Sequence, residues 1–116
     1  MLKIFAVIVN YHEHNRTLSL LQSLSNQQGK FELTTIVIDN SGNENLKKYF
    51  PKKSSKNILI GSKSNVGFAK AVNKGVRLAL HLEADYIWLV NPDILIPPDF
   101  LKLILKNKAD IVGPII

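Results

Sequence analysis

Asp93 is the residue whose type and position best suit metal chemistry. It closes the segment Asn91-Pro92-Asp93, directly after an apolar run, and Pro92 restricts the backbone so that a turn is expected there. A carboxylate on such a turn can bind Mg²⁺ or Mn²⁺, because these ions take oxygen ligands and use substrate phosphates to complete their shell. The alternative is a turn residue that only holds the loop. Asn91 is neutral, so it is expected to shape the turn or reach a ligand rather than bind metal.

Tyr11 and Gly67 are further candidates for contact with a ligand. The Tyr11 ring could lie against a flat base, or it could anchor the loop in which it stands. Gly67 precedes a helical pattern, where a missing side chain lets a ligand approach the backbone and where N–H groups face anions. Close helix packing is the other explanation for this glycine. His12 and His14 have no cysteine or third histidine nearby, so a zinc site is not expected.

These candidates follow apolar, β-branched runs that are interpreted as strands. Most runs are continuously apolar, which is typical of parallel strands covered on both faces. Helical patterns separate them, so the predicted fold class is α/β, with a mostly parallel sheet, right-handed crossovers and helices on both faces. The predicted strands are Ile4–Val9, Thr34–Asp39, Asn57–Ile60, Tyr86–Val90 and Asp110–Ile115.

Four helices are predicted between these strands. The first has Asn15 as its N-cap, the second covers Glu44–Phe50, and the fourth has Pro98 at its first position. The third is the clearest, because its apolar and basic residues separate onto opposite faces. Its predicted apolar face is Phe68, Val72, Val76 and Ala79, and its basic face is Lys70, Lys74, Arg77 and His81.

The chain carries a net charge of +6 and has a pI near 9.7. This excess favours an acidic partner, although a basic face that is merely solvated is the simplest explanation. An anionic membrane surface is the next candidate, because each basic residue near it contributes about 1 kcal/mol. Nucleic acid is the least expected partner, since no aromatic residues interleave with the lysines as a stacking platform.

In an open α/β sheet, ligands bind beyond the carboxyl ends of the strands. The loop that follows the first predicted strand, Asn10–Asn15, contains no glycine. It is therefore neither a dinucleotide-binding fingerprint nor a phosphate-cradling P-loop. The clustered acids of a receiver domain are absent from it too.

Four short segments stand at the ends of successive predicted strands and cover nearly the whole chain. They are Val7-Ile8-Val9-Asn10-Tyr11, Val37-Ile38-Asp39-Asn40-Ser41, Asn65-Val66-Gly67-Phe68-Ala69 with Asn73 and Gly75, and Asn91-Pro92-Asp93 with Pro97. Together they resemble glycosyltransferase family 2, and especially its rhamnosyltransferase-like branch. The resemblance implies the GT-A fold, a nucleotide-diphosphate sugar donor and a divalent metal. Many relatives carry Asp-x-Asp where this chain has Asn-Pro-Asp, a form familiar in the rhamnosyltransferase-like branch.

The resemblance also implies roles for two residues that end predicted strands, Asp39 and Asn10. It places Asp39 where a carboxylate accepts a hydrogen bond from the N3–H of a pyrimidine, which favours a UDP or dTDP donor because cytosine lacks that hydrogen. A turn-starting aspartate is the alternative. Asn10 is expected close to the nucleotide.

The implied reaction moves a sugar, with rhamnose from a dTDP donor as the leading candidate, to a polysaccharide or lipid-linked acceptor with inversion. Its carboxylate general base lies in the later half of related domains and is expected beyond Ile116. A non-catalytic nucleotide- or sugar-binding module on the same half-fold is the competing hypothesis. A nucleotidyltransferase would need a glycine- and arginine-rich loop after the first strand, which this chain lacks.

The remaining expectations concern location and extent. No apolar run approaches the ~20 residues that span a bilayer, and the amino terminus has the pattern of a strand rather than of a signal peptide. The absence of cysteine suits a reducing cytoplasm, so a cytoplasmic protein, at most peripheral on the membrane face, is expected. Because the last residues form an apolar run, residues 1–116 are interpreted as the donor-binding first part of a longer domain.

Overall fold

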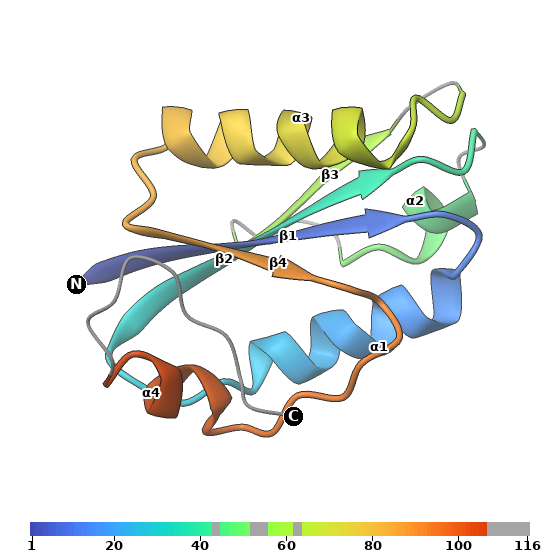
Figure 1. Ribbon diagram of the computed structural model, residues 1–116. Coiled ribbons are helices and arrows are strands. Elements are labelled where there is room, and N and C mark those ends of the chain that lie inside the picture. Colours follow the sequence, from blue (N-terminus) through green and yellow to red (C-terminus); the bar gives the residue numbers. More distant parts are fainter. Residues whose placement is uncertain (43–44, 52–55, 62–63, 107–116) are drawn as a thin grey trace.

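The computed structural model describes residues 1–42, 45–51, 56–61 and 64–106. Its centre is a parallel sheet in the order β3-β2-β1-β4 (Figure 1). The strands are β1 (Leu2–Asn10), β2 (Phe31–Asp39), β3 (Asn57–Gly61) and β4 (Tyr86–Val90).

The first four predicted strands are confirmed. β1 and β2 begin earlier than expected, because the pairing of the two strands starts at Leu2 and Phe31. The strand predicted over residues 110–115 lies outside the described residues.

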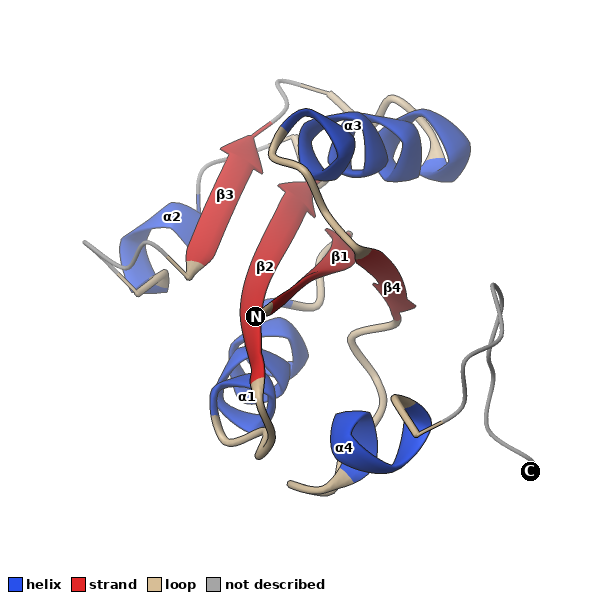
Figure 2. Ribbon diagram, turned by 90° about the vertical axis from the view of Figure 1, so that its left-hand side faces the viewer, coloured by secondary structure: helices blue, strands red, loops and turns tan. Residues whose placement is uncertain are grey.

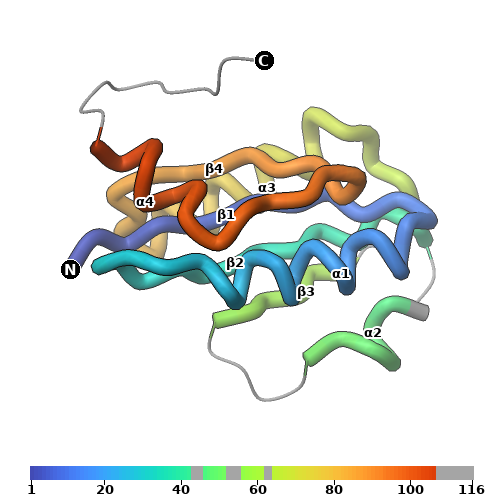
Figure 3. The backbone as a smooth tube through the Cα atoms, turned by 90° about the horizontal axis from the view of Figure 1, so that it is seen from below, coloured from blue at the N-terminus to red at the C-terminus, as the bar shows by residue number. Residues whose placement is uncertain are grey.

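Helices cover both faces of the sheet. α3 (Phe68–His81) lies on one face, whereas α1 (His14–Ser25) and α4 (Phe100–Ile104) lie on the other (Figure 2). The short helix α2 (Asn45–Tyr49) is on the α1 side, next to β3 (Figure 3). Strands and helices alternate along the whole described chain, which confirms the α/β class. Within this part of the chain, no helix is long and apolar enough to cross a membrane.

Two separate core clusters hold these layers together, one on each face of the sheet. Successive residues of a strand point to opposite faces, so each continuously apolar strand contributes to both clusters. The cluster on the α1 side includes Ala6, Ile8, Leu20, Leu21, Leu24, Val37, Leu46, Phe50, Val90 and Ile96. The cluster on the α3 side includes Phe5, Ile36, Ile38, Ala71 and Ala79.

α3 buries its predicted apolar face only in part: Ala79 is buried and Val72 and Val76 are half-buried, but Phe68 is not. The buried residues of α3 are Ala71, Gly75 and Ala79, and Phe68 is 64% exposed. The reason is a close approach to the sheet: a Cβ added to Gly75 would lie 2.4 Å from Cγ1 of Val7. Small residues at this contact let the helix lie against the strands, so they decide which face turns inward.

Two predicted helix starts also need correction. α1 begins at His14 with Glu13 in the N-cap position, not at Asn15, because the Thr17 N–H already bonds the Glu13 carbonyl at 2.9 Å. α4 begins only at Phe100, with Asp99 in the N-cap position. Pro98 therefore precedes this helix rather than occupying its first position.

Candidate functional site

The loops after the strands gather at one edge of the sheet, because parallel strands share a direction. Register fixes the alignment: Asn10 is opposite Asp39, Asp39 is opposite Gly61, and Ile8 is opposite Val90. We call this side the carboxyl edge; the arrowheads of β1 and β2 mark it in Figure 1. Each candidate residue predicted from sequence is either the last residue of a strand, as Asn10 and Asp39 are, or lies on the segment that follows one.

Asn10 is the centre of a buried hydrogen-bond network at this edge. Its side chain is fully buried, and its Oδ1 accepts from the Thr17 hydroxyl at 2.6 Å. Its amide nitrogen lies 3.0 Å from Asp39 Oδ1, 3.0 Å from His14 Nδ1 and 3.3 Å from Ser41 Oγ. Because a carboxylate only accepts, the contact with Asp39 fixes which end of the amide carries the nitrogen. Asn10 thereby ties β1 to both β2 and α1.

The two oxygens of Asp39 have different surroundings. Oδ1 accepts from the Asn10 amide and from the Ser41 N–H at 3.2 Å. Oδ2 makes no hydrogen bond to a described residue, and no fully buried side-chain oxygen or nitrogen of the described chain lacks a partner. Oδ2 is therefore reachable from outside, although Asp39 as a whole is only 2% exposed. One oxygen is held by the protein, and the other keeps contact with solvent.

Asn40 and Asn65, to which the sequence analysis assigned no role, make a second connection at this edge. Asn40 is 2% exposed; its amide donates to Asn65 Oδ1 at 2.6 Å, and its Oδ1 accepts from the Val66 N–H at 2.9 Å. Asn65 Oδ1 also accepts from the Gly67 N–H at 2.8 Å. The end of β2 thus holds the loop that leads into α3. The sequence feature that could have pointed to Asn40 is its position directly after Asp39 at a strand end.

Gly67 is required by the backbone and not by packing. Its φ of 88° and ψ of 154° lie in a region that is essentially restricted to glycine. A Cβ added there would meet nothing within 4 Å, which excludes helix packing as the explanation. The Gly67 N–H is occupied by Asn65, so what this residue offers a ligand is open space beside the backbone.

Tyr11, Asn91 and Asp93 are the exposed members of the candidate set. Tyr11 is 52% exposed, and its ring centroid lies 4.4 Å from that of His12 in a tilted arrangement. Asn91 and Asp93 are exposed on the turn after β4. The Asp93 side chain makes no hydrogen bond or ion pair with a described residue.

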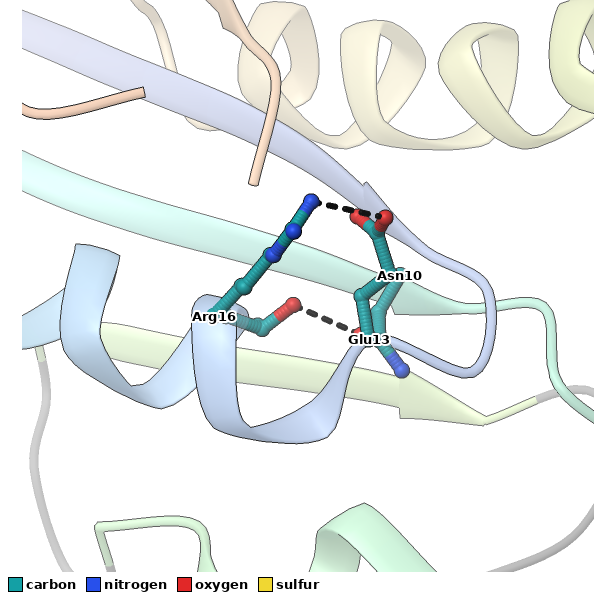
Figure 4. Close-up of polar contacts among 4 residues, drawn as sticks. Asn10, Glu13 and Arg16 are labelled. Carbon is teal, nitrogen blue, oxygen red and sulfur yellow. Dashed lines mark hydrogen bonds and ion pairs between the residues drawn. The ribbon is translucent and has the colours of Figure 1, made fainter. Parts of the chain in front are cut away.

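Glu13 and Arg16 form the one ion pair between described residues of the structure. Arg16 Nη1 lies 3.6 Å from Glu13 Oε1, at the start of α1 and close to Asn10 (Figure 4). Both side chains are substantially exposed, so this pair contributes little to stability. The pair nevertheless gives the Glu13 carboxylate, which lies at the carboxyl edge, a partner within the protein.

Solved structures with this arrangement define the fold. TarS of S. aureus, solved as residues 1–349 alone and in complex with UDP, superposes with a TM-score of 0.71 at 22% sequence identity. The match covers 90% of this chain and 31–32% of the TarS chains. This chain therefore has the GT-A fold.

Sequence comparison gives the family. The model of glycosyl transferase family 2 matches residues 5–114, and the chain belongs to that family. An uncharacterised protein of Methanocaldococcus jannaschii, MJ0544, is 31% identical over 110 residues, which are 90% of this chain and 46% of that protein. The chain thus spans about half the length of this relative.

Proposed function

We propose that this chain binds a nucleoside-diphosphate sugar at the carboxyl edge and serves the transfer of that sugar to an acceptor. The observation that carries the proposal is the Asp39 carboxylate, whose Oδ1 is held by two donors while Oδ2 remains open. A charged oxygen that is fixed in place suits the N–H of a ligand. Membership of family 2 supports glycosyl transfer as the reaction class.

The proposed base is uracil or thymine. Either would donate its N3–H to Asp39 Oδ2, whereas the N3 of cytosine carries no hydrogen in its neutral form. Tyr11 is half exposed on the adjoining loop and would lie against the base ring. The complex of the structurally similar TarS with UDP supports a nucleotide of this type.

Asn10 would act through Asp39 rather than touch the nucleotide. It is fully buried, and both ends of its amide are already engaged within the protein. Its contribution is to hold the carboxylate in one orientation before the ligand arrives. A preorganised acceptor loses less conformational freedom on binding, which favours affinity.

Asp93 is the proposed ligand of Mg²⁺ or Mn²⁺. The described residues contain no group of three side chains able to hold a metal, so they would supply fewer than three ligands, and Asp93 is the one that we propose. That number fits Mg²⁺, which commonly takes one or two carboxylates together with phosphate oxygens and water. Asp93 is suited to this role because its side chain is exposed and makes no bond with a described residue. A bound cation would offset the charge of the diphosphate as it leaves the sugar.

Gly67 and Asn91 would border the rest of the donor. The open space beside the Gly67 backbone leaves room for a ligand, and Asn91 stands on the same turn as Asp93. The proposed sugar is rhamnose from dTDP-rhamnose, a choice that rests on Asn91-Pro92-Asp93 in place of Asp-x-Asp. The proposed acceptor is a polysaccharide or a lipid-linked glycan, attacked with inversion at the anomeric carbon.

A thermal-shift screen of UDP, dTDP, GDP and CDP, with and without Mn²⁺, tests this proposal. We expect UDP and dTDP to raise the Tm, CDP to do so less, and Mn²⁺ to enhance the effect. Asp39→Asn should remove the preference for UDP over CDP, because an amide can turn its N–H toward cytosine N3. Equal shifts with all four nucleotides, or none with any, would contradict the proposal.

A non-catalytic nucleotide-binding module would give the same shifts, so it needs a separate test. The two functions differ in transfer of the sugar, which is assayed on a protein that carries this chain together with a general base. Release of nucleoside diphosphate from dTDP-rhamnose, dependent on added acceptor, would support the enzyme. Tight binding without such release would support the binding module.

A further inference from the structure

The outer face of α3 carries a row of four basic residues. Lys70, Lys74, Arg77 and His81 follow one another at spacings of four, three and four, and all four side chains are exposed. Such spacings place them in one stripe along the helix. α3 contains no acidic residue from Phe68 to His81. The nearest acid beyond its end is Glu83, so the stripe is strongest at Lys70, Lys74 and Arg77.

No acidic side chain of the described protein neutralises this stripe. The ion pair of Arg16 with Glu13 is on the opposite face, and Lys70, Lys74 and Arg77 form none with any described residue. The inward face of α3 is pressed against the sheet through Gly75. Because α3 packs against the sheet through its other face, the basic side chains point away from the sheet. Leu80, which is 61% exposed, lies along the border of the stripe.

We propose that this stripe is a contact surface for an anionic lipid bilayer. A bilayer fits because the stripe is straight, extends along a helix of about 21 Å (14 residues at a rise of about 1.5 Å) and is bordered by the exposed apolar side chain of Leu80. Lysine and arginine stems can bury their methylene groups at a lipid interface while their charges meet the headgroups. A nucleic acid would need several stacking rings along the stripe, but no Phe, Tyr or Trp lies within it, and Phe68 stands apart at the first residue of α3.

The position of α3 gives this contact a functional consequence. The helix begins at Phe68, directly after Gly67, so one end of the stripe lies at the carboxyl edge (Figure 1). A protein that rests on lipid through α3 would therefore hold the proposed donor site near the membrane surface. The contact itself does not depend on the proposed glycosyl transfer and can be tested without it.

Vesicle co-sedimentation tests the surface. The test variant is Lys70→Glu with Lys74→Glu on α3, and the control is Lys47→Glu with Lys48→Glu on α2. Both variants lower the net charge by the same amount, and all four lysines are exposed, but α2 lies on the opposite face of the sheet. The lipids are phosphatidylcholine alone and phosphatidylcholine mixed with phosphatidylglycerol. Thermal unfolding confirms that each variant is folded.

We expect the wild-type chain to bind only the vesicles that contain phosphatidylglycerol, and to dissociate at about 1 M salt, where screening acts within about 3 Å. The α3 variant should bind at least about 25-fold more weakly, or about fivefold per lysine removed, and the α2 variant should bind nearly as the wild type does. Three results would overturn the proposal: no vesicle binding by the wild type, equal losses in the two variants, or a single-stranded oligonucleotide that competes with the vesicles at α3.

Discussion

At the scale of single residues, Asp93 carries the clearest prediction. Replacing Asp93 with alanine should abolish the metal-dependent part of UDP binding, because the only proposed protein ligand of the cation is lost. The loss should be about 1.5–3 kcal/mol, the scale of a charged hydrogen-bonding contact. Isothermal titration with and without Mn²⁺ measures it. Asp99→Ala is the control, since that carboxylate is also exposed and makes no capping hydrogen bond. Unchanged Mn²⁺-dependent affinity in Asp93→Ala would place the metal elsewhere.

Asn10 carries a second prediction at the same scale. Asn10→Ala should weaken UDP binding more than CDP binding, because it frees the Asp39 carboxylate to turn. It should also destabilise the fold by about 1–3 kcal/mol, since Asp39, His14 and Thr17 lose a buried partner. The ratio of the two affinities separates positioning from stability, because a purely structural defect lowers both affinities alike.

The control for Asn10→Ala is Ile4→Val, at the opposite end of β1. Ile4 is 1% exposed, and this substitution should cost about 0.5–1.5 kcal/mol without changing the affinity ratio. If Asp39→Asn removes the preference for UDP and Asn10→Ala does not, Asp39 recognises the base, but Asn10 is not needed to position it. If neither variant alters the preference, Asp39 does not read the base.

At the scale of elements, the contact of α3 with β1 depends on the absence of a side chain at Gly75. Gly75→Ala should destabilise the protein by about 1–3 kcal/mol, because the new methyl group would overlap Val7 Cγ1 and force the helix away. Urea unfolding measures the change. Gly61→Ala is a matched control: a Cβ there meets nothing within 4 Å, so we expect a change within about 0.5 kcal/mol.

A second substitution makes the element-scale prediction sharper. Val7→Ala removes the methyl groups that a Gly75 side chain would meet, so the double variant should be less destabilised than the sum of the two single variants. Simple additivity would show that the cost of Gly75→Ala comes from the backbone and not from this contact.

At the scale of the whole molecule, we predict that these 116 residues bind donor but do not transfer its sugar. Three described carboxylates stand at the carboxyl edge, and each has another role: Glu13 is paired with Arg16, Asp39 is bonded to Asn10, and Asp93 is the proposed metal ligand. None is left to deprotonate an acceptor hydroxyl. A missing general base typically costs about 10²–10⁴ in rate.

A radiolabelled transfer assay with dTDP-rhamnose and lipid-linked acceptors measures this prediction. The same preparation should still show nucleotide-dependent thermal shifts, which separates a missing base from a failure to bind donor. Robust turnover by this chain alone would mean that one of these three carboxylates, or a residue outside the described ranges, serves as the base.

The sequence was sufficient for the order and type of the elements. Continuously apolar runs separated by helical patterns predicted a parallel α/β sheet, and the first four strands lie where the runs are. The sequence was also sufficient to assign the chain to family 2. Each of the short segments at the strand ends is a continuous stretch of sequence, so it can be recognised without the structure. The rhamnosyltransferase-like branch, the metal and the individual site roles stay predictions.

The sequence was less informative wherever a contact joins residues far apart in the chain. The inward face of α3 was predicted only in part: Ala79 is buried as expected, but hydrophobicity favoured Phe68 whereas close packing on Val7 selected Gly75. The starts of α1 and α4 differ from the predicted ones for a similar reason. A residue can cap a helix only where the preceding loop places its backbone at the first turn. Local preferences are small beside tertiary packing, so they set the presence of a helix better than its limits.

The amino acid sequence by itself determined which polar residues end each strand, and the parallel topology then brought those ends to one edge. Only the tertiary structure decided what each of them does there. It buried Asn10 and bonded it to Asp39, it left one carboxylate oxygen open, and it used Asn40 to hold the loop before α3. The physical reason is that a hydrogen bond depends on distance and direction across neighbouring strands, which the order of residues along one strand does not contain.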